Sequence, residues 1–260
     1  MQKEVLIIIP AYNEEKNISG VLDSLEKIQI PEFADVLVMN DSSSDNTNFV
    51  VKRRKYALVT HVFNLGYGSA LQLGYKYAVR RGYRYVIQMD ADGQHDVCNI
   101  KNIYDKLRES DENGLCPDIV LGSRYVEGSS PFKVSAVKKF AYNLFGFMIF
   151  CGTGRKINDP TTGLQGLSYR TFLYYSKYNH FDDKYPDANI IMHMLLLGYR
   201  VAEIPAVMHR REFGTSMHSG LKPVVYMMRM TFSMLAVLFS DKVLKTEKAL
   251  GDDDVFIWKK

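Results

Sequence analysis

The sequence is poor in cysteine and has no long apolar run. Its 260 residues include three cysteines, Cys98, Cys116 and Cys151, and none of them forms a C-x-x-C pair. A disulfide framework and a zinc site are therefore disfavoured, and we expect inert thiols. No segment reaches the roughly 20 apolar residues of a membrane span. Residues 1–4 lack the basic start of a signal peptide, which predicts a cytoplasmic protein.

A strong charge of either sign is also missing. The formal net charge is only +4, so the total charge predicts no nucleic-acid partner. The apolar fraction of 47% is typical of a globular protein. A chain of this length can form one large α/β domain with a sizeable core. We expect one composite domain over residues 1–217 and a helical extension over residues 218–260.

Apolar segments alternate with amphipathic ones in the first half. Short apolar runs predict strands at Val5–Ile9, Val36–Met39, Ala57–Val62, Tyr85–Met89 and Ile119–Leu121. Helices are expected between them, one with Asn13 as its cap and another over Gly68–Arg81. Further on, a helix is expected over Asp187–Leu197 and a strand over Tyr199–Ile204. Strands that are apolar on both faces indicate a mostly parallel sheet with helices on both faces, an α/β fold.

Two carboxylates follow the fourth predicted strand, in the segment Asp90–Gln94. Aspartates two residues apart in one turn can converge on a hard cation such as Mg²⁺ or Mn²⁺ and leave positions for phosphate oxygens. Polar clusters also follow the other strands. The carboxyl ends of parallel strands line the ligand crevice of such sheets. The segment is therefore predicted to bind a metal, although solvated turn aspartates are the alternative.

The chain resembles glycosyltransferase family 2, which has the GT-A fold, and within it the polyprenyl-phosphate glycosyltransferase branch that includes dolichol-phosphate mannose synthase. The resemblance lies in five motifs in family order, covering about residues 4–216: Ile8–Glu14, Asn40–Asp45, Asp90–His95, Gly122–Tyr125 and Asp159–Gly163. It implies an inverting transferase that uses a UDP- or GDP-sugar. It also implies roles for particular residues. Pro10, Tyr12, Glu14 and Asp41 would bind the nucleotide, Asp90, Asp92 and Gln94 the metal, and Arg124 a phosphate. Arg211 would help to close the site, with Ser216 near phosphate.

Further residues are predicted to belong to the site, and some of them have two possible roles. Asn40 and Ala91 belong to the predicted substrate-binding set, although Asn40 stands where family members usually have aspartate. Gly68, in a glycine-rich turn, either lines the donor pocket or allows close helix packing. Asp187 is interpreted as a helix cap or as a catalytic base. His95 is either a ligand or an ordinary turn histidine.

Two apolar segments with basic starts complete the predictions. Lys138 and Lys139 precede Phe140–Cys151, and a second segment covers Met230–Phe239. Such helices suit a peripheral membrane contact, or else an interface in a homo-oligomer. The predicted acceptor is a polyprenyl phosphate, with a saccharide hydroxyl as the alternative. A haloacid dehalogenase-type phosphatase and a non-catalytic nucleotide-binding protein are the readings from other classes.

Overall fold

A single mixed sheet organises the chain in a computed structural model that describes residues 3–130, 136–211, 213 and 222–241. Its strand order is β3-β2-β1-β4-β6-β5-β7. The strands are β1 (Val5–Ala11), β2 (Ala34–Asn40), β3 (Ala57–Thr60), β4 (Tyr85–Gln88), β5 (Ile119–Ser123), β6 (Gln165–Ser168) and β7 (Val201–Pro205). The helices are α1 (Glu15–Lys27), α2 (Ile30–Phe33), α3 (Thr47–Arg53), α4 (Tyr67–Arg81), α5 (Cys98–Arg108), α6 (Ala136–Thr153), α7 (Tyr169–Ser176), α8 (Ala188–Leu196) and α9 (Lys222–Phe239).

The order of the strands reverses at β1. This strand pairs in parallel with β2 on one side and with β4 on the other. Such a reversal opens a crevice beyond the carboxyl ends of the two strands, where ligands of α/β proteins bind. The predicted parallel α/β sheet is confirmed. The antiparallel strand β6, which lies between β4 and β5, was not predicted.

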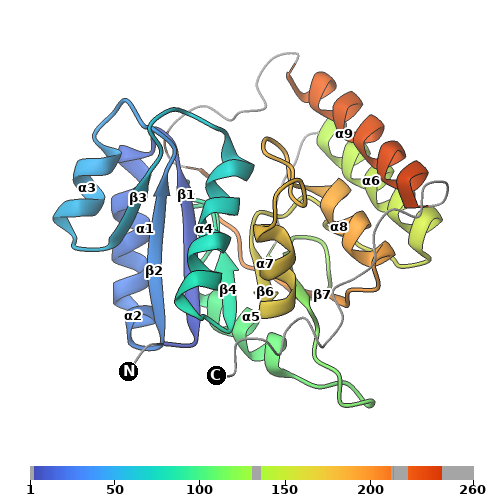
Figure 1. Cartoon of the computed structure of the whole chain (residues 1–260), viewed down its shortest axis with the longest axis horizontal. Coiled ribbons are helices and arrows are strands. Elements are labelled where there is room, and N and C mark those ends of the chain that lie inside the picture. Colours follow the sequence, from blue (N-terminus) through green and yellow to red (C-terminus); the bar gives the residue numbers. More distant parts are fainter. Residues whose placement is uncertain (1–2, 131–135, 212, 214–221, 242–260) are drawn as a thin grey trace.

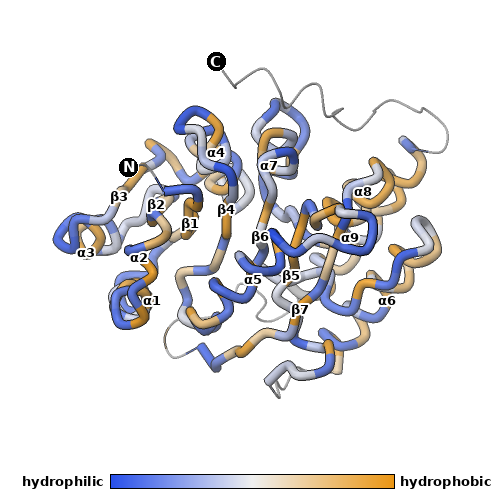
Figure 2. Tube along the Cα trace, turned by 90° about the horizontal axis from the view of Figure 1, so that it is seen from below, coloured by the Kyte–Doolittle hydropathy of each residue, from blue (hydrophilic) through white to orange (hydrophobic). Residues whose placement is uncertain are grey.

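Helices cover both faces of the sheet. In Figure 2, α4 and α7 lie on one side of the strands and α1 and α5 on the other. Alternate residues of β1 belong to the two hydrophobic cores on either side of the sheet, because successive side chains of a strand point to opposite faces. Leu6 and Ile8 belong to the core under α4, whereas Val5, Ile7 and Ile9 belong to the core under α1. Both faces of β1 are therefore buried in apolar cores, as the continuous apolar run predicts.

Three helices, α6, α8 and α9, form a group at the β7 end of the sheet (Figure 1). Helix α9 packs against both α6 and α8, and its Met230 and Met234 are buried in the core. In the part of the chain that the structure describes, no helix meets the length and apolarity needed to cross a membrane. The boundary near residue 217 falls outside the described residues and stays a prediction.

Some local predictions are wrong. Glu14, not Asn13, occupies the N-cap position of α1 and makes no side-chain capping bond. Asn13 instead has a left-handed φ of 56°, and its Oδ1 accepts a hydrogen bond from the Ser44 amide at 2.8 Å. Several strand bounds also differ by one or two residues, since β3 ends at Thr60 and β7 begins at Val201. The amide contact with Ser44 joins the loops after β1 and β2.

Candidate functional site

The predicted site residues converge at the carboxyl edge where β1 and β4 diverge. Tyr12 and Glu14 follow β1, Asp41 follows β2, and Asp90 follows β4. Arg211 approaches this edge from the segment after β7. That segment is fixed beside the turn after β4, because the His209 amide donates to the carbonyl oxygen of Gln94 at 2.7 Å. The topology thus brings together groups that lie up to about 200 residues apart in the chain.

The Asp90 carboxylate is hydrogen-bonded through both of its oxygens. The Tyr67 hydroxyl donates to Oδ1 at 2.9 Å, and Nε2 of His95 lies 3.2 Å from Oδ2. Burial alone would raise the pKa of Asp90, but the bonds from His95 and Tyr67 hold it below its usual value. Asp90 is therefore ionised at neutral pH. His95 is buried and is not an ordinary exposed turn histidine.

Asp92 sits in a different electrostatic environment. Burial and the nearby charge of Asp90 raise the pKa of Asp92 to about 6. Its Oδ1 accepts the Gln94 amide at 3.0 Å, a turn that the left-handed φ of 75° at Gly93 allows. The ionised carboxylates of Asp90 and Asp92 repel one another, and this repulsion contributes to the raised pKa of Asp92. A cation between them would remove that repulsion.

The donor set fits a hard divalent cation. Asp90, Asp92 and Gln94 offer carboxylate and amide oxygens, which Mg²⁺ and Mn²⁺ prefer, and these metals are usually held by one or two carboxylates together with substrate phosphates. Within the described ranges, no three or more histidine, cysteine or carboxylate side chains gather as a ready metal site. The two aspartates would therefore share the cation with the diphosphate of a bound donor.

Arg211 bridges the two strand ends. Its Nη2 donates to Oε1 of Glu14 at 2.5 Å, and its Nη1 lies 3.6 Å from Oδ2 of Asp92. Its Nε donates to the carbonyl oxygen of Phe213 at 2.7 Å. The guanidinium therefore lies beside the predicted metal-binding aspartate, and its role in closing the site stays a prediction. Ser216, predicted to act with it, lies outside the described residues.

Asp41 holds the loop that follows β3. Its carboxylate accepts the amides of Leu65 at 2.9 Å and Gly66 at 2.8 Å, and it lies 2.7 Å from Nδ1 of His61. Asp41 and His61 are both buried. Asn40, its neighbour, binds the Ser43 amide through Oδ1 at 3.1 Å. Both residues thus shape loops of the predicted nucleotide pocket, and their contacts with a base stay predictions.

Replacing Asp41 by alanine should weaken both nucleotide binding and folding. The Leu65 and Gly66 amides lose a buried acceptor, and a lost partner of this kind costs about 1–3 kcal/mol. We expect a loss of similar size in the affinity for a nucleoside diphosphate, measured by calorimetry. Unchanged affinity for both UDP and GDP would remove Asp41 from the nucleotide site.

Arg124 is bound to a buried carboxylate. Its Nε and Nη2 donate to the two oxygens of Asp159 at 2.7 and 2.6 Å, and the Asp159 side chain is fully buried. Its guanidinium carbon lies 5.0 Å from the centre of the Tyr142 ring. Burial alone would lower the pKa of Arg124, but Asp159 raises it above its usual value. Arg124 is therefore first the counter-ion of Asp159, and its contact with a substrate phosphate stays a prediction.

Asp187 does not cap α8 with its side chain, so that interpretation is wrong. Its Oδ2 instead accepts the hydroxyl of Tyr226, on α9, at 2.7 Å. Burial and the charge of Asp90 raise the pKa of Asp187 to about 6, against the effect of the Tyr226 bond. The carboxylate thus has the protonation behaviour that its alternative reading, a catalytic base, requires.

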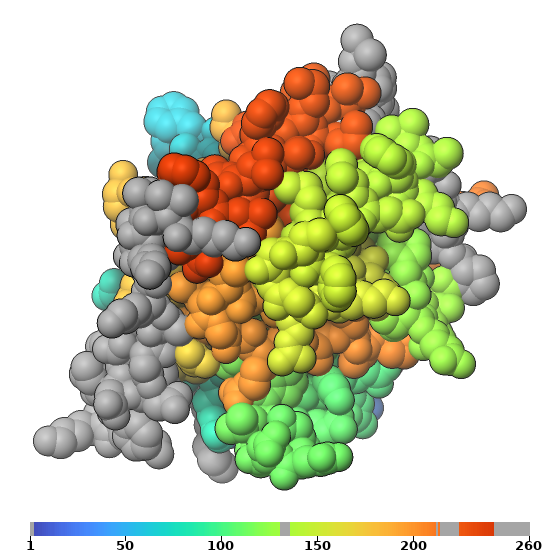
Figure 3. Space-filling view, turned by 90° about the vertical axis from the view of Figure 1, so that its right-hand side faces the viewer, coloured from blue at the N-terminus to red at the C-terminus, as the bar shows by residue number. Residues whose placement is uncertain are grey.

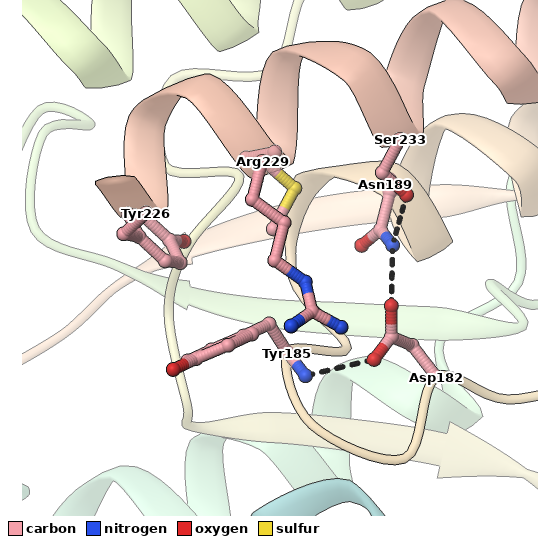
Figure 4. A pocket seen from close by; sticks show the side chains of 7 residues that line it. Asp182, Tyr185, Asn189, Tyr226, Arg229 and Ser233 are labelled. Carbon is pink, nitrogen blue, oxygen red and sulfur yellow. Dashed lines mark hydrogen bonds between the residues drawn. The ribbon is translucent and has the colours of Figure 1, made fainter. Parts of the chain in front are cut away.

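Helix α9 is fastened to the loop that carries Asp187. Figure 4 shows a small cavity in which Asn189 donates to the Ser233 hydroxyl at 2.9 Å and to Asp182 at 3.3 Å. The Arg229 guanidinium carbon lies 5.0 Å from the centre of the Tyr185 ring. These contacts tie the 182–189 segment to α9. The α6–α8–α9 group therefore packs against the segment that carries Asp187, the candidate base of the site.

The glycine-rich turn has a packing role. A side chain at Gly68 would collide with the backbone of Asp182 and Asp183, which explains the glycine by close packing. Its part in the donor pocket stays a prediction, as do those of Pro10, buried near the end of β1, and Ala91, buried in the turn after β4. His193 is structural, since its Nε2 lies 2.7 Å from the Tyr174 hydroxyl.

Sequence reasoning missed several residues of the site. The sequence places Tyr67 in a glycine-rich turn and Asp159 in a turn motif without indicating their partners, and it gives no signal for His61 or Tyr226. A polar residue inside a family motif, as Asp159 is, was a usable signal. The others bind partners 20 to 39 positions away, and no local pattern indicates such pairs.

Comparison with known proteins agrees with this architecture. Residues 6–176 match Glycosyl transferase family 2. The undecaprenyl-phosphate mannosyltransferase of Micrococcus luteus is 29% identical and covers 83% of this chain and 88% of its own. The UDP-N-acetylglucosamine–dolichyl-phosphate N-acetylglucosaminyltransferase of Methanococcus voltae is 28% identical and covers 64% and 70%. Several other curated relatives are matched over two thirds of their length or less.

A solved structure shares the fold. The mannosyltransferase PcManGT of Pyrobaculum calidifontis, in complex with GDP-Man and Mn²⁺, aligns with a TM-score of 0.61 at 19% identity, covering 96% of this chain and 66% of its own. The GT-A expectation is confirmed by this likeness. With a match that spans more than half of its residues, the chain belongs to glycosyltransferase family 2.

Proposed function

We propose that this protein transfers a sugar from a nucleoside diphosphate to a polyprenyl phosphate, with inversion and with the help of a divalent cation. The observation that carries the proposal is the cluster of Asp90, Asp92 and Arg211 at the edge where β1 and β4 diverge. The relatives named above act on undecaprenyl or dolichyl phosphate, which supports the acceptor.

The proposed reaction is a direct displacement at the anomeric carbon. The phosphate oxygen of the acceptor forms the new bond as the bond to the nucleoside diphosphate breaks, and the diphosphate leaves with the electron pair. Held by Asp90, Asp92 and Gln94, a cation would neutralise charge on the leaving diphosphate. Arg211 lies close enough to Asp92 to add positive charge on the same side. An acceptor phosphate is already an anion at neutral pH, so no strong base is required.

The α6–α9 face is the proposed contact with the acceptor's membrane. Helix α6 exposes Phe140, Phe147 and Phe150, and α9 exposes Val225 and Phe232 among other apolar side chains. The two helices lie next to one another on the surface in Figure 3. Exposed apolar side chains that gather on one face mark an interaction site. Because a polyprenyl chain resides in a bilayer, we assign the face to peripheral membrane binding, with Lys139 at its basic start.

Flotation with liposomes tests the membrane contact. The wild type should float with vesicles that contain anionic lipid. The changes Phe147→Glu and Phe232→Glu should each lower the partition coefficient about 10-fold to 100-fold, since burying one such side chain contributes about 1.5–3 kcal/mol.

Phe49→Glu is the matched control, because Phe49 on α3 is as exposed as Phe147, at 64% for both. It should float like the wild type. If the wild type stays off the liposomes and Phe147→Glu instead turns a dimer into a monomer, the face is a homo-oligomer interface and the membrane assignment is wrong.

A saccharide hydroxyl is the second candidate acceptor, and the raised pKa of Asp187 favours it. A hydroxyl must lose its proton, and a positioned base typically contributes 10²- to 10⁴-fold. The change Asp187→Asn separates the two. Transfer to a phosphate acceptor should fall less than about 10-fold in this variant, whereas transfer to a hydroxyl should fall by about 10²-fold or more. If Asp187→Asn lowers transfer to a lipid phosphate by about 10²-fold or more, the proposed mechanism is contradicted.

A further inference from the structure

The hydroxyl of Tyr67 is placed to orient Asp90. Tyr67 is the first residue of α4, and its hydroxyl donates to Oδ1 of Asp90 at 2.9 Å. An ionised carboxylate only accepts hydrogen bonds, whereas a phenolic hydroxyl carries a proton at neutral pH, so Tyr67 is the donor of this bond.

The backbone that carries Tyr67 is itself fixed. Gly66, just before the helix, has a φ of 102°, which favours glycine. The Ser69 amide donates to the carbonyl oxygen of Asp183 at 3.0 Å, and a side chain at Gly68 would meet the carbonyl carbon of Asp183 at 2.7 Å. The first turn of α4 is therefore packed against the 182–183 segment, which fixes the backbone from which the Tyr67 side chain extends.

Asp90 is confined from two other directions. Nε2 of His95 lies 3.2 Å from Oδ2. Nδ1 of His95 is buried with no partner among the described residues, which favours the tautomer with its proton on Nε2, toward Asp90. A side chain at Gly163 would also lie 2.9 Å from the carboxyl carbon of Asp90. The carboxylate thus rests against the backbone of Gly163, with one donor for each oxygen.

We propose that Tyr67 is a positioning residue that, together with His95, fixes the Asp90 carboxylate in the orientation in which it receives the divalent cation. The inference rests on the proposed function, because it takes Asp90 as a cation ligand. Each carboxylate oxygen keeps a second lone pair after accepting one hydrogen bond, so the bonds from Tyr67 and His95 leave room for the metal. Loss of such an outer partner typically lowers metal affinity 10-fold to 100-fold.

The test compares Tyr67→Phe with Tyr75→Phe. Tyr75 lies on the same helix, is fully buried, and donates its hydroxyl to Gln88 and not to an aspartate, so the control removes the same group elsewhere. Binding of Mn²⁺ to the purified protein with UDP or GDP present is measured by the electron paramagnetic resonance signal of free Mn²⁺. We expect affinity for Mn²⁺ to fall 10-fold to 100-fold in Tyr67→Phe and to stay within about twofold in Tyr75→Phe. Transfer by Tyr67→Phe should also recover as Mn²⁺ is raised, which a purely structural defect would not do.

A second variant tests the orientation of Asp90 without changing Tyr67. The added methyl group of Gly163→Ala would collide with the Asp90 carboxylate and should also weaken Mn²⁺ binding by at least 10-fold. Equal Mn²⁺ affinity in the wild type and a folded Tyr67→Phe would overturn the inference and leave the proposed function standing. If Tyr67→Phe does not fold, unchanged affinity in Gly163→Ala overturns it instead. A wild type that binds no Mn²⁺ with either nucleotide would overturn both the inference and the metal assignment.

Discussion

Replacing Asp92 by alanine should lower sugar transfer by about 10³-fold or more while the fold stays intact. The change removes one of two carboxylates that would hold the cation, and a bound metal supplies several kcal/mol of charge stabilisation, at 1.36 kcal/mol for each factor of ten. Asp92 is only partly buried and its pKa is raised, so its loss relieves repulsion with Asp90. Initial rates of transfer and a thermal melt measure the two effects.

Asp105→Ala provides the control for this experiment. Asp105 is an exposed carboxylate on α5, and its loss should leave the rate within about twofold. Full activity of Asp92→Ala, or undiminished activity of the wild type in excess chelator, would contradict the metal assignment.

The same residue predicts a pH dependence of stability without metal. The folded protein holds the proton of Asp92 more tightly than the unfolded chain does, because the folded pKa is about 6 and the ordinary value is 3.8. Stability should therefore fall as the pH rises from about 4 to 7, relative to Asp92→Asn. Added Mn²⁺ should reduce that difference at pH 7, since a cation favours the ionised form. A difference that is independent of pH, in unfolding titrations of the two proteins, would refute the raised pKa.

Replacing Arg124 by alanine should destabilise the protein by about 3–5 kcal/mol. The change leaves the fully buried carboxylate of Asp159 without its counter-ion, and an uncompensated buried charge has an effect of this size. The Arg124 amide still donates to Asp159 at 2.9 Å, which places the expected loss toward the lower end. Denaturant unfolding of the two proteins measures the free energy of unfolding.

Two further variants separate charge burial from a general loss of packing. Arg54 forms an ion pair with Asp23 in which both side chains are partly exposed, and Arg54→Ala should lower stability by less than about 1 kcal/mol. Adding Asp159→Asn to Arg124→Ala should recover part of the lost stability, because it removes the unpaired charge. If Arg124→Ala lowers the free energy of unfolding no more than Arg54→Ala does, the ion pair between Arg124 and Asp159 does not stabilise the site.

The parallel half of the sheet could be predicted because its strands are buried on both faces. Val5–Ile9 and Val36–Met39 are continuous apolar runs, and periodicity reports such segments well. Strand β6, Gln165–Ser168, gives no such signal. It has four residues, among them a glutamine and a glycine, and it becomes a strand only because β4 and β5 flank it. Its pairing is a tertiary effect that a local pattern does not contain.

The site was predictable at the level of which segments meet, but not of which side chains pair. The position of Asp90 after a buried strand places it at the ligand edge. Its bond to Tyr67 depends on the angle at which α4 enters the fold. Asp187 shows the same limit, since its place at the start of α8 suggested a cap and the Tyr226 hydroxyl takes its carboxylate instead. Such pairings depend on how helices pack and not on spacing along the chain.

The most direct test of the proposed function is transfer of labelled sugar to a lipid phosphate by the purified full-length chain. UDP- and GDP-sugars are supplied one at a time with Mn²⁺, and undecaprenyl or dolichyl phosphate is offered beside a soluble oligosaccharide. We predict that, with at least one donor, label enters the organic phase as a glycosyl phosphate lipid, and that chelator or Asp92→Ala abolishes it. Label found only in the soluble oligosaccharide would contradict the lipid-phosphate acceptor, and metal-independent transfer would contradict the role of the two aspartates.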